Sequence, residues 1–150
     1  MKILSQNVQG MNSRAKQHYI INQCKAYDIS FLQETKLTLS NRLFLKAKWG
    51  SEMVCMAATS TARRGVITLV HVRCAAILIT EVADDRGQYH IALIRIRDKN
   101  YLLCNINGDP TSDAEVHNTL TKLNDKMEEI KTQYLIDQNI LGGDYNLCIS

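Results

Sequence analysis

The chain has 150 residues, of which 45% are hydrophobic, with one proline and seven glycines. This length and composition suit a single compact domain with a hydrophobic core, and they argue against a disordered or loop-rich protein. The net charge of +3 is too small to indicate nucleic-acid binding by itself, but residues 1–75 carry +8 and residues 76–150 carry −5. A first half this basic can contact a polyanion.

The N-terminal stretch MKILSQNVQG turns polar after two apolar residues, unlike a signal peptide. No apolar run approaches the roughly 18 residues that a membrane span requires. The five cysteines are scattered through apolar segments, and none belongs to a CxxC or Cys/His pair at zinc spacing, so we expect reduced core thiols. These features predict an intracellular protein, nuclear or cytoplasmic, that is neither secreted nor membrane-bound.

The first part of the chain predicts a β-α-β unit followed by a second helix. A strand is expected over residues 2–8, then a helix capped by Ser13, then a strand over residues 28–33. The apolar face of the first helix comprises Ile20, Ile21, Cys24 and Tyr27. Ser40 is expected to cap the second helix. Its apolar side comprises Leu43, Phe44 and Ala47.

The rest of the chain predicts strands and then one long helix. Short apolar runs indicate strands over residues 53–58, 65–70, 75–82, 88–97 and 101–106, the last two forming a hairpin. Ser112 and Glu115 have the spacing of a helix capping box. The apolar face of that helix comprises Val116, Leu120, Leu123, Met127 and Ile130. A final strand runs through Ile140 and Leu141 into a glycine pair.

These elements predict a mixed sheet with helices on one side. The strand around residues 89–96 has apolar side chains on both faces, since Ile91 and Leu93 alternate with Ala92 and Ile94. A sheet that is apolar on both faces must be covered on both. We therefore expect one face to be left uncovered by this chain and available for self-association.

Polar residues recur where the predicted strands end. They are Asn7, Glu34, Asn105, Asn107, Asp144 and Asn146. In open α/β sheets, binding and catalytic sites lie at the ends of the strands. Carboxylates and amides there can supply oxygen ligands for Mg²⁺ and can accept a proton from water. Each residue also has an ordinary alternative, because Asn and Asp beside Gly are turn residues and Glu34 can be a solvated loop acid. No His or Cys cluster offers a softer metal site.

Five stretches resemble, in order, the motifs of the endonuclease/exonuclease/phosphatase superfamily. They are ILSQNVQGMNS, ISFLQETKL, RRGVITLVH, LLCNINGDP and NILGGDYNL. The pattern is most similar to the endonuclease domain of LINE-type (non-LTR) retrotransposons, and more distantly to exonuclease III-like apurinic endonucleases. The resemblance implies an α/β fold that is part of a four-layered sandwich, with mixed sheets flanked by helices. Residues 1–150 would form a single, incomplete domain whose C-terminal strands are missing.

The resemblance also implies a DNA-nicking, Mg²⁺-dependent phosphodiesterase, with Mn²⁺ as an alternative ion. Glu34 would be the main metal ligand and Asn7 a metal-shell or phosphate contact. Asp144 would orient or deprotonate the attacking water, and Asn146 would hold the nucleophile and the scissile phosphate. Lys36 stands where the family often has His, and the family's terminal Ser-Asp-His motif is absent, so impaired activity is expected.

Arg42, Lys46 and Arg64 lie in basic stretches beside these motifs and are candidates for DNA phosphate contacts. The alternative for Arg42 and Lys46 is an ordinary solvated helix face. Three other functions remain open. They are a catalytically inactive fragment or interaction module, an apurinic endonuclease, and a phosphatase of the same superfamily.

Overall fold

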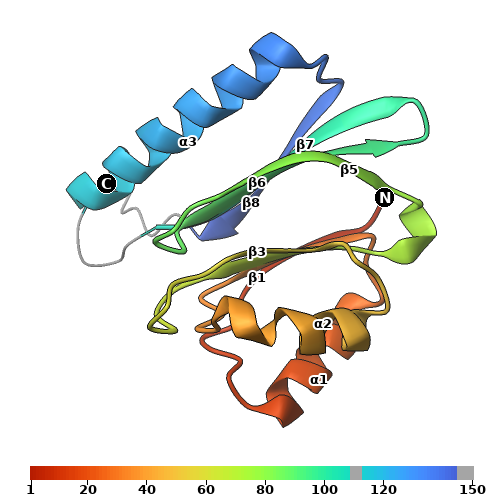
Figure 1. The fold of residues 1–150 in the computed structure, drawn as a ribbon, viewed down its shortest axis with the longest axis vertical. Helices are drawn as coiled ribbons and strands as arrows, with labels where there is room; N and C mark the ends of the chain where they lie inside the picture. The colour runs from red at the N-terminus through yellow and green to blue at the C-terminus, as the bar shows by residue number, and fades with distance from the viewer. Residues whose placement is uncertain (109–112, 145–150) are drawn as a thin grey trace.

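The computed structural model describes residues 1–108 and 113–144 and contains two four-stranded sheets packed face to face (Figure 1). The first sheet has the spatial order β1 (Ile3–Asn7), β2 (Ile29–Gln33), β4 (Val66–Val70), β3 (Val54–Ala57). The second has the order β5 (Ile77–Ala83), β6 (Tyr89–Ile96), β7 (Lys99–Asn107), β8 (Gln138–Asp144). Strands β1 and β2 are parallel, as are β7 and β8, and the other neighbours are antiparallel.

Helices cover the outer faces of both sheets. Helices α1 (Arg14–Cys24) and α2 (Arg42–Trp49) lie on the first sheet, and α3 (Asp113–Gln133) lies on the second (Figure 1). Two 3₁₀ turns, Leu39–Asn41 and Val72–Cys74, complete the described elements. The layers are therefore helix, sheet, sheet and helix, which confirms the predicted α/β sandwich.

The prediction of one mixed sheet with an uncovered face is wrong for the residues that the structure describes. The chain itself supplies a second sheet, so the inner faces cover one another, and α3 covers the outer face of β6 and β7. The core between the sheets contains Ile29, Phe31, Cys55, Val70, Ala92, Ile94 and Leu103. The core under α3 includes Ile91, Leu93, Leu102, Cys104, Ile106, Leu123 and Ile130. Self-association stays a prediction, and it can no longer rest on an open sheet face.

The two N-terminal helices differ in how well the sequence predicted them. In α1 the Ser13 hydroxyl accepts a hydrogen bond from the Lys16 amide at 3.2 Å, which confirms the predicted cap. Ser40 does not cap α2, because a 3₁₀ turn precedes that helix and begins after Thr38. The predicted apolar face of α2, with Leu43, Phe44 and Ala47, was also wrong. It buries Leu45 and Trp49, and the Trp49 indole N–H is satisfied by the carbonyl of Val70 at 3.0 Å.

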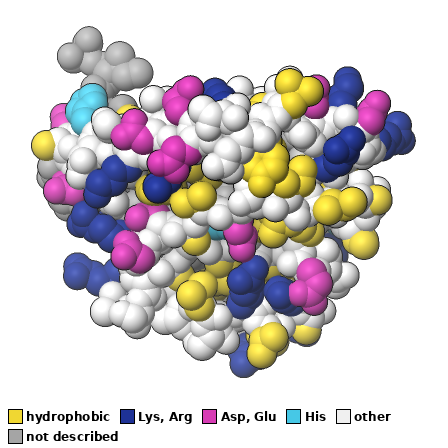
Figure 2. All heavy atoms as spheres, turned by 45° about the horizontal axis from the view of Figure 1, so that its top comes forward, with side chains coloured by type: hydrophobic (Ala, Val, Ile, Leu, Met, Phe, Trp, Pro, Cys, Tyr) yellow, Lys and Arg dark blue, Asp and Glu magenta, His cyan; other side chains and the backbone are white. Residues whose placement is uncertain are grey.

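The charge asymmetry of the sequence follows the layers. Residues 1–75 build the first sheet with α1 and α2, whereas residues after 75 build the second sheet with α3. On the face shown in Figure 2, Lys and Arg side chains lie among Asp and Glu side chains. Cys24, Cys55, Cys74 and Cys104 are unbridged, as predicted, and Cys148 lies outside the described residues. Across those residues no helix is both long and apolar enough to cross a membrane.

Candidate active site

Three of the four predicted catalytic residues meet at one end of the sandwich. Asn7 is the last residue of β1, Glu34 directly follows β2, and Asp144 is the last residue of β8 in the other sheet. The Asn7 amide nitrogen Nδ2 donates to Glu34 Oε2 at 2.9 Å and to Asp144 Oδ2 at 2.8 Å. The structure thus gathers two carboxylates around one amide. The fourth residue, Asn146, lies outside the described residues.

Local backbone geometry orients this cluster. The backbone N–H of Gln9 donates to Asn7 Oδ1 at 3.0 Å, which fixes the amide so that its nitrogen points at the carboxylates. Gln9, Glu34 and Lys36 all have left-handed φ angles of 52°, 55° and 56°. The Glu34 carbonyl accepts from the Gly10 amide at 2.7 Å, which helps to hold this conformation. Residues with strained backbone angles of this kind are often found at active sites, where the backbone fixes the direction of a functional side chain.

The glycine pair before Asp144 allows β8 to approach the first sheet closely. A Cβ atom at Gly142 would lie 2.5 Å from the ring of Phe31, and one at Gly143 would lie 2.4 Å from the carbonyl oxygen of Ile106. Gly143 also has a φ of +146°, and its N–H donates to the hydroxyl of Ser5 on β1 at 3.0 Å. Gly142 therefore allows β8 to lie close to β2 of the first sheet, and Gly143 allows it to lie close to its neighbour β7 just before Asp144.

The chemistry of these donors fits a hard divalent cation. Two carboxylates in a partly exposed position at converging strand ends are the ligand type that Mg²⁺ and Mn²⁺ prefer. The Glu34 side chain is 34% exposed, and its Oε1 lies 3.4 Å from the Lys36 ammonium. Glu34 therefore interacts with a cationic group on one oxygen and with the Asn7 amide on the other. A bound cation would compete with Lys36 for this carboxylate.

Within the described part of the chain, neither Asn105 nor Asn107 has a side-chain hydrogen bond to Glu34 or Asp144, although Asn107 pairs in register with Asp144. Asn105 is fully buried, and its Oδ1 accepts from Gln33 Nε2 at 3.0 Å. Its Nδ2 donates to the carbonyl oxygens of Ile67 and Leu32 at 3.0 and 3.2 Å. Asn105 thus joins the two sheets behind the site. Asn107 is also buried, beside the carbonyl of Gln88 that its own backbone N–H contacts at 2.7 Å.

A polar hollow adjoins the segment that follows Glu34. Its volume is about 310 Å³, and it is lined by Thr59, Thr61, Arg63, Arg64, Asp85 and Arg86. The carbonyl of Arg64 accepts from the Lys36 amide at 2.7 Å, so the hollow adjoins the segment that carries Glu34. Arg64 was predicted to contact DNA. Arg86 was missed, because it lies in a turn that looks ordinary in sequence and reaches this place only when the sheets pack.

The other two predicted DNA contacts lie elsewhere. Arg42 Nε donates to the carbonyl of Val54 at 3.2 Å, and Lys46 pairs with Glu52 at 2.6 Å. Val54 begins β3, whereas the strand ends near Glu34 align with the last residue of β3, Ala57. The structure therefore does not bring Arg42 and Lys46 together with the carboxylate cluster.

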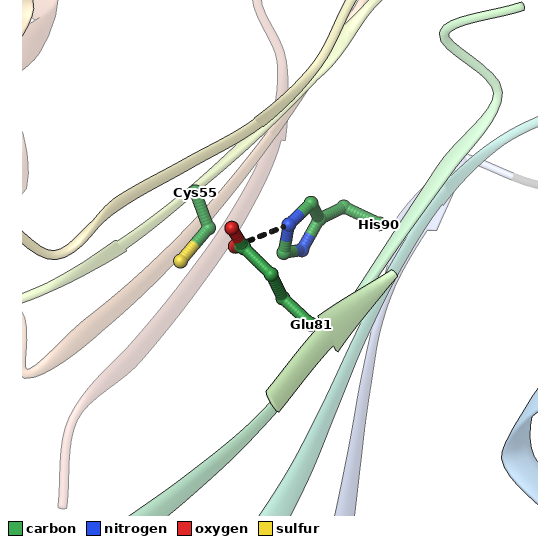
Figure 3. A group of neighbouring side chains, drawn as sticks. All are labelled: Cys55, Glu81 and His90. Carbon is green, nitrogen blue, oxygen red and sulfur yellow. Dashed lines mark hydrogen bonds and ion pairs between the residues drawn. The ribbon is translucent and has the colours of Figure 1, made fainter. Parts of the chain in front are cut away.

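A second polar cluster contradicts the expectation that no His or Cys cluster exists. Cys55 on β3, Glu81 on β5 and His90 on β6 lie together between the two sheets (Figure 3). His90 Nε2 and Glu81 Oε2 are 3.0 Å apart. The three residues are separated by 26 and 9 positions in sequence, so no short motif marks them, and only the packing of one sheet on the other reveals the group.

No protein-family model and no curated protein matches the sequence, but solved structures do. TDP2 from Caenorhabditis elegans aligns with a TM-score of 0.70 and 18% identity over 99% of this chain and 48% of that one. An endonuclease/exonuclease/phosphatase family protein from Bacteroides thetaiotaomicron aligns with a TM-score of 0.71 and 13% identity. This alignment covers 97% of this chain and 62% of that one. The chain therefore has the fold of that superfamily, and it spans about half to two thirds of the length of these structures.

Two further structures show which kinds of protein share this fold. The mannosyl-6-phosphatase Bt3783 of Bacteroides thetaiotaomicron aligns with a TM-score of 0.69 and 12% identity, over 97% of this chain and 64% of that one. TDP2 from D. rerio, complexed with a single-strand DNA product, aligns with a TM-score of 0.63 and 16% identity. This alignment covers 98% of this chain and 60% of that one. At such identities the likeness is one of fold.

Proposed function

We propose that a chain with this fold and these strand-end carboxylates is a phosphodiesterase that depends on a divalent cation and nicks DNA. The observation that carries the proposal is the Asn7 amide, which contacts Glu34 and Asp144 at 2.9 and 2.8 Å at the junction of the two sheets. The sequence motifs favour the type of endonuclease found in LINE retrotransposons, because LQET and GGDYN contain Glu34 and Asp144.

Each residue of the cluster has a proposed role. Glu34 holds the cation, Mg²⁺ or Mn²⁺, which when bound offsets negative charge on the phosphoryl oxygens. Asp144 accepts a proton from the attacking water. Asn7 keeps the two carboxylates at a fixed separation, and Asn146 is proposed to position the water and the phosphate.

The hollow that adjoins the segment after Glu34 supports a nucleic-acid substrate. Arg63, Arg64 and Arg86 line this hollow and can pair with backbone phosphates, for which Arg86 would exchange its ion pair with Glu115 at 3.8 Å. Binding through phosphates weakens steeply with added salt and does not depend on sequence. The single-strand DNA product bound to the D. rerio TDP2 structure gives a precedent for such a ligand on this fold.

The test measures cation binding and catalysis separately. We expect Mn²⁺ binding, followed by electron paramagnetic resonance, to be lost in Glu34→Gln. Nicking of supercoiled plasmid should fall by about 100-fold or more in both Glu34→Gln and Asp144→Asn. Glu52→Gln is the matched control, since Glu52 is 87% exposed and pairs only with Lys46 among the ion pairs described. Equal nicking by wild type and both site variants would refute the proposal.

A phosphomonoesterase is the second candidate, favoured by the fold shared with the mannosyl-6-phosphatase. Both candidates use the same carboxylates, so the substrates separate them. Release of inorganic phosphate from hexose 6-phosphates, with no nicking of plasmid, would select the phosphatase. In that case Arg63→Ala should raise the KM for the sugar phosphate, and neither this variant nor the wild type should nick plasmid.

A further inference from the structure

A second group of metal-ligating side chains lies between the sheets, away from the carboxylate cluster. One ligand atom from each of Cys55, Glu81 and His90 lies within 4.8 Å of the others. Figure 3 shows the three side chains converging from β3 on one sheet and from β5 and β6 on the other. β3 and β5 are the edge strands at the border opposite β1 and β8.

The surroundings of this cluster are apolar, which makes its polar atoms unusual. Cys55 and His90 are each 1% exposed, beside the core that contains Phe31 and Ala92. Nδ1 of His90 is buried without a hydrogen-bond partner in the described structure, although Nε2 contacts Glu81. Buried polar atoms without partners are rare in proteins. The nitrogen that faces the cluster is Nε2, which lies 3.0 Å from Glu81 Oε2.

The cluster also has an opening to solvent. The Glu81 side chain is 35% exposed, so one ligand reaches the surface while the other two are interior. An ion entering beside Glu81 would meet the imidazole and the sulfur directly. Three protein ligands leave one tetrahedral position for water.

The ligand types match one class of ion. A thiolate, an imidazole and a carboxylate suit Zn²⁺ or Co²⁺, whereas Mg²⁺ prefers oxygen ligands alone. Zinc–ligand bonds of about 2.0 to 2.3 Å place tetrahedral ligand atoms about 3.3 to 3.8 Å apart. The observed separations, all within 4.8 Å, need only a small inward movement to reach this range.

We propose that Cys55, Glu81 and His90 form a Zn²⁺ site that fastens the first sheet to the second. Cysteine binds Zn²⁺ as a thiolate, so the Cys55 thiol releases its proton to the solvent when the metal binds. Because the ligands come from both sheets, the bound ion stabilises the folded chain.

Co²⁺ titration of the reduced full chain tests this site. Saturating Mg²⁺ is added so that the carboxylate cluster is occupied. We expect the strong visible bands of tetrahedral Co²⁺ with a thiolate charge-transfer band in the near ultraviolet, both displaced by Zn²⁺. His90→Gln should weaken binding by about 100-fold or more, and Cys55→Val should abolish the charge-transfer band. Cys104→Val, a matched change at another thiol that is 1% exposed, should leave the spectrum unchanged.

Two outcomes would overturn the proposal. One is a charge-transfer band that persists in Cys55→Val, and the other is a Co²⁺ spectrum without any thiolate band in the wild type. If Cys55→Val does not fold, X-ray absorption at the zinc edge of the wild-type chain decides the matter. One sulfur with two or three nitrogen or oxygen neighbours supports the site, and a shell without sulfur refutes it.

Discussion

Two polar clusters join the sheets of this sandwich, and they differ in place, chemistry and visibility in the sequence. The cluster of Asn7, Glu34 and Asp144 lies at strand ends, is partly exposed and consists of carboxylates and an amide. The cluster of Cys55, Glu81 and His90 lies between the sheets and contains a thiol and an imidazole that are almost fully buried. The first suits a hard cation in contact with substrate, and the second suits a softer ion that holds structure.

A row of polar residues, buried at Gln33 and Asn105, lies between the two clusters. Gln33 Nε2 donates to Ser5 Oγ at 3.2 Å and to Asn105 Oδ1 at 3.0 Å. Asn105 in turn pairs in register with His90 on the neighbouring strand. The clusters are therefore separate sites within one interior, and variants that affect one and spare the other can distinguish them.

The largest effect is expected from adding a methyl group beside the strand-end cluster. Gly143→Ala should lower the free energy of unfolding by about 3 kcal/mol, because the new Cβ meets the Ile106 carbonyl at 2.4 Å and φ is unfavourable. Urea unfolding measures this. Gly50→Ala is the control, since its φ is also positive but the new Cβ has open space, and its cost should be about 1 kcal/mol. Equal losses would show that close approach of β8 is unimportant.

A smaller effect is expected from breaking the polar row. Asn105→Leu removes hydrogen bonds to Gln33, Leu32 and Ile67, and we expect a loss of about 2 kcal/mol in urea unfolding. Mn²⁺ binding at Glu34 should weaken, whereas the Co²⁺ spectrum should keep its thiolate band. The same change at exposed Asn139 should cost less than about 0.5 kcal/mol. Loss of the thiolate band in Asn105→Leu would show that the two clusters are coupled.

The buried Cys104 thiol makes the free energy of unfolding depend on pH. Burial raises the pKa of Cys104 to about 12, above its unfolded value of 9.0. Its contribution to stability is therefore complete below pH 9 and is lost as the pH rises toward 12, at up to about 1.4 kcal/mol per pH unit. Cys104→Val should show a shallower decline than wild type in urea unfolding between pH 9 and 10.5. Parallel curves would contradict this assignment.

The smallest effect is expected from removing the cation beside Glu34. Lys36→Met deletes an ammonium that lies 3.4 Å from the carboxylate, so Mn²⁺ affinity should rise up to about fivefold. Lys46→Met removes an ammonium from Glu52, at the other end of the sheet, and should leave the affinity unchanged. A decrease in affinity in Lys36→Met would mean that Lys36 supports the site instead of competing with the cation.

Much of the fold was predictable, because strand periodicity and the Ser13 cap are local properties of the sequence. The convergence of Asn7, Glu34 and Asp144 was expected from strand ends and motifs, although single residues did not prove it. Packing between distant elements was not predictable in the same way. It made α2 bury Trp49 in place of Leu43, supplied the second sheet, and assembled the Cys55 cluster, and none of these leaves a short-range pattern.

The hydrogen bond between Asn7 and Asp144 joins residues that are 137 positions apart. During synthesis, β1 leaves the ribosome long before β8. The carboxylate cluster can therefore form only after almost all of the described chain has emerged. Contacts of such long range also slow folding. A copy that ends before β8 lacks Asp144 and therefore has no complete carboxylate cluster.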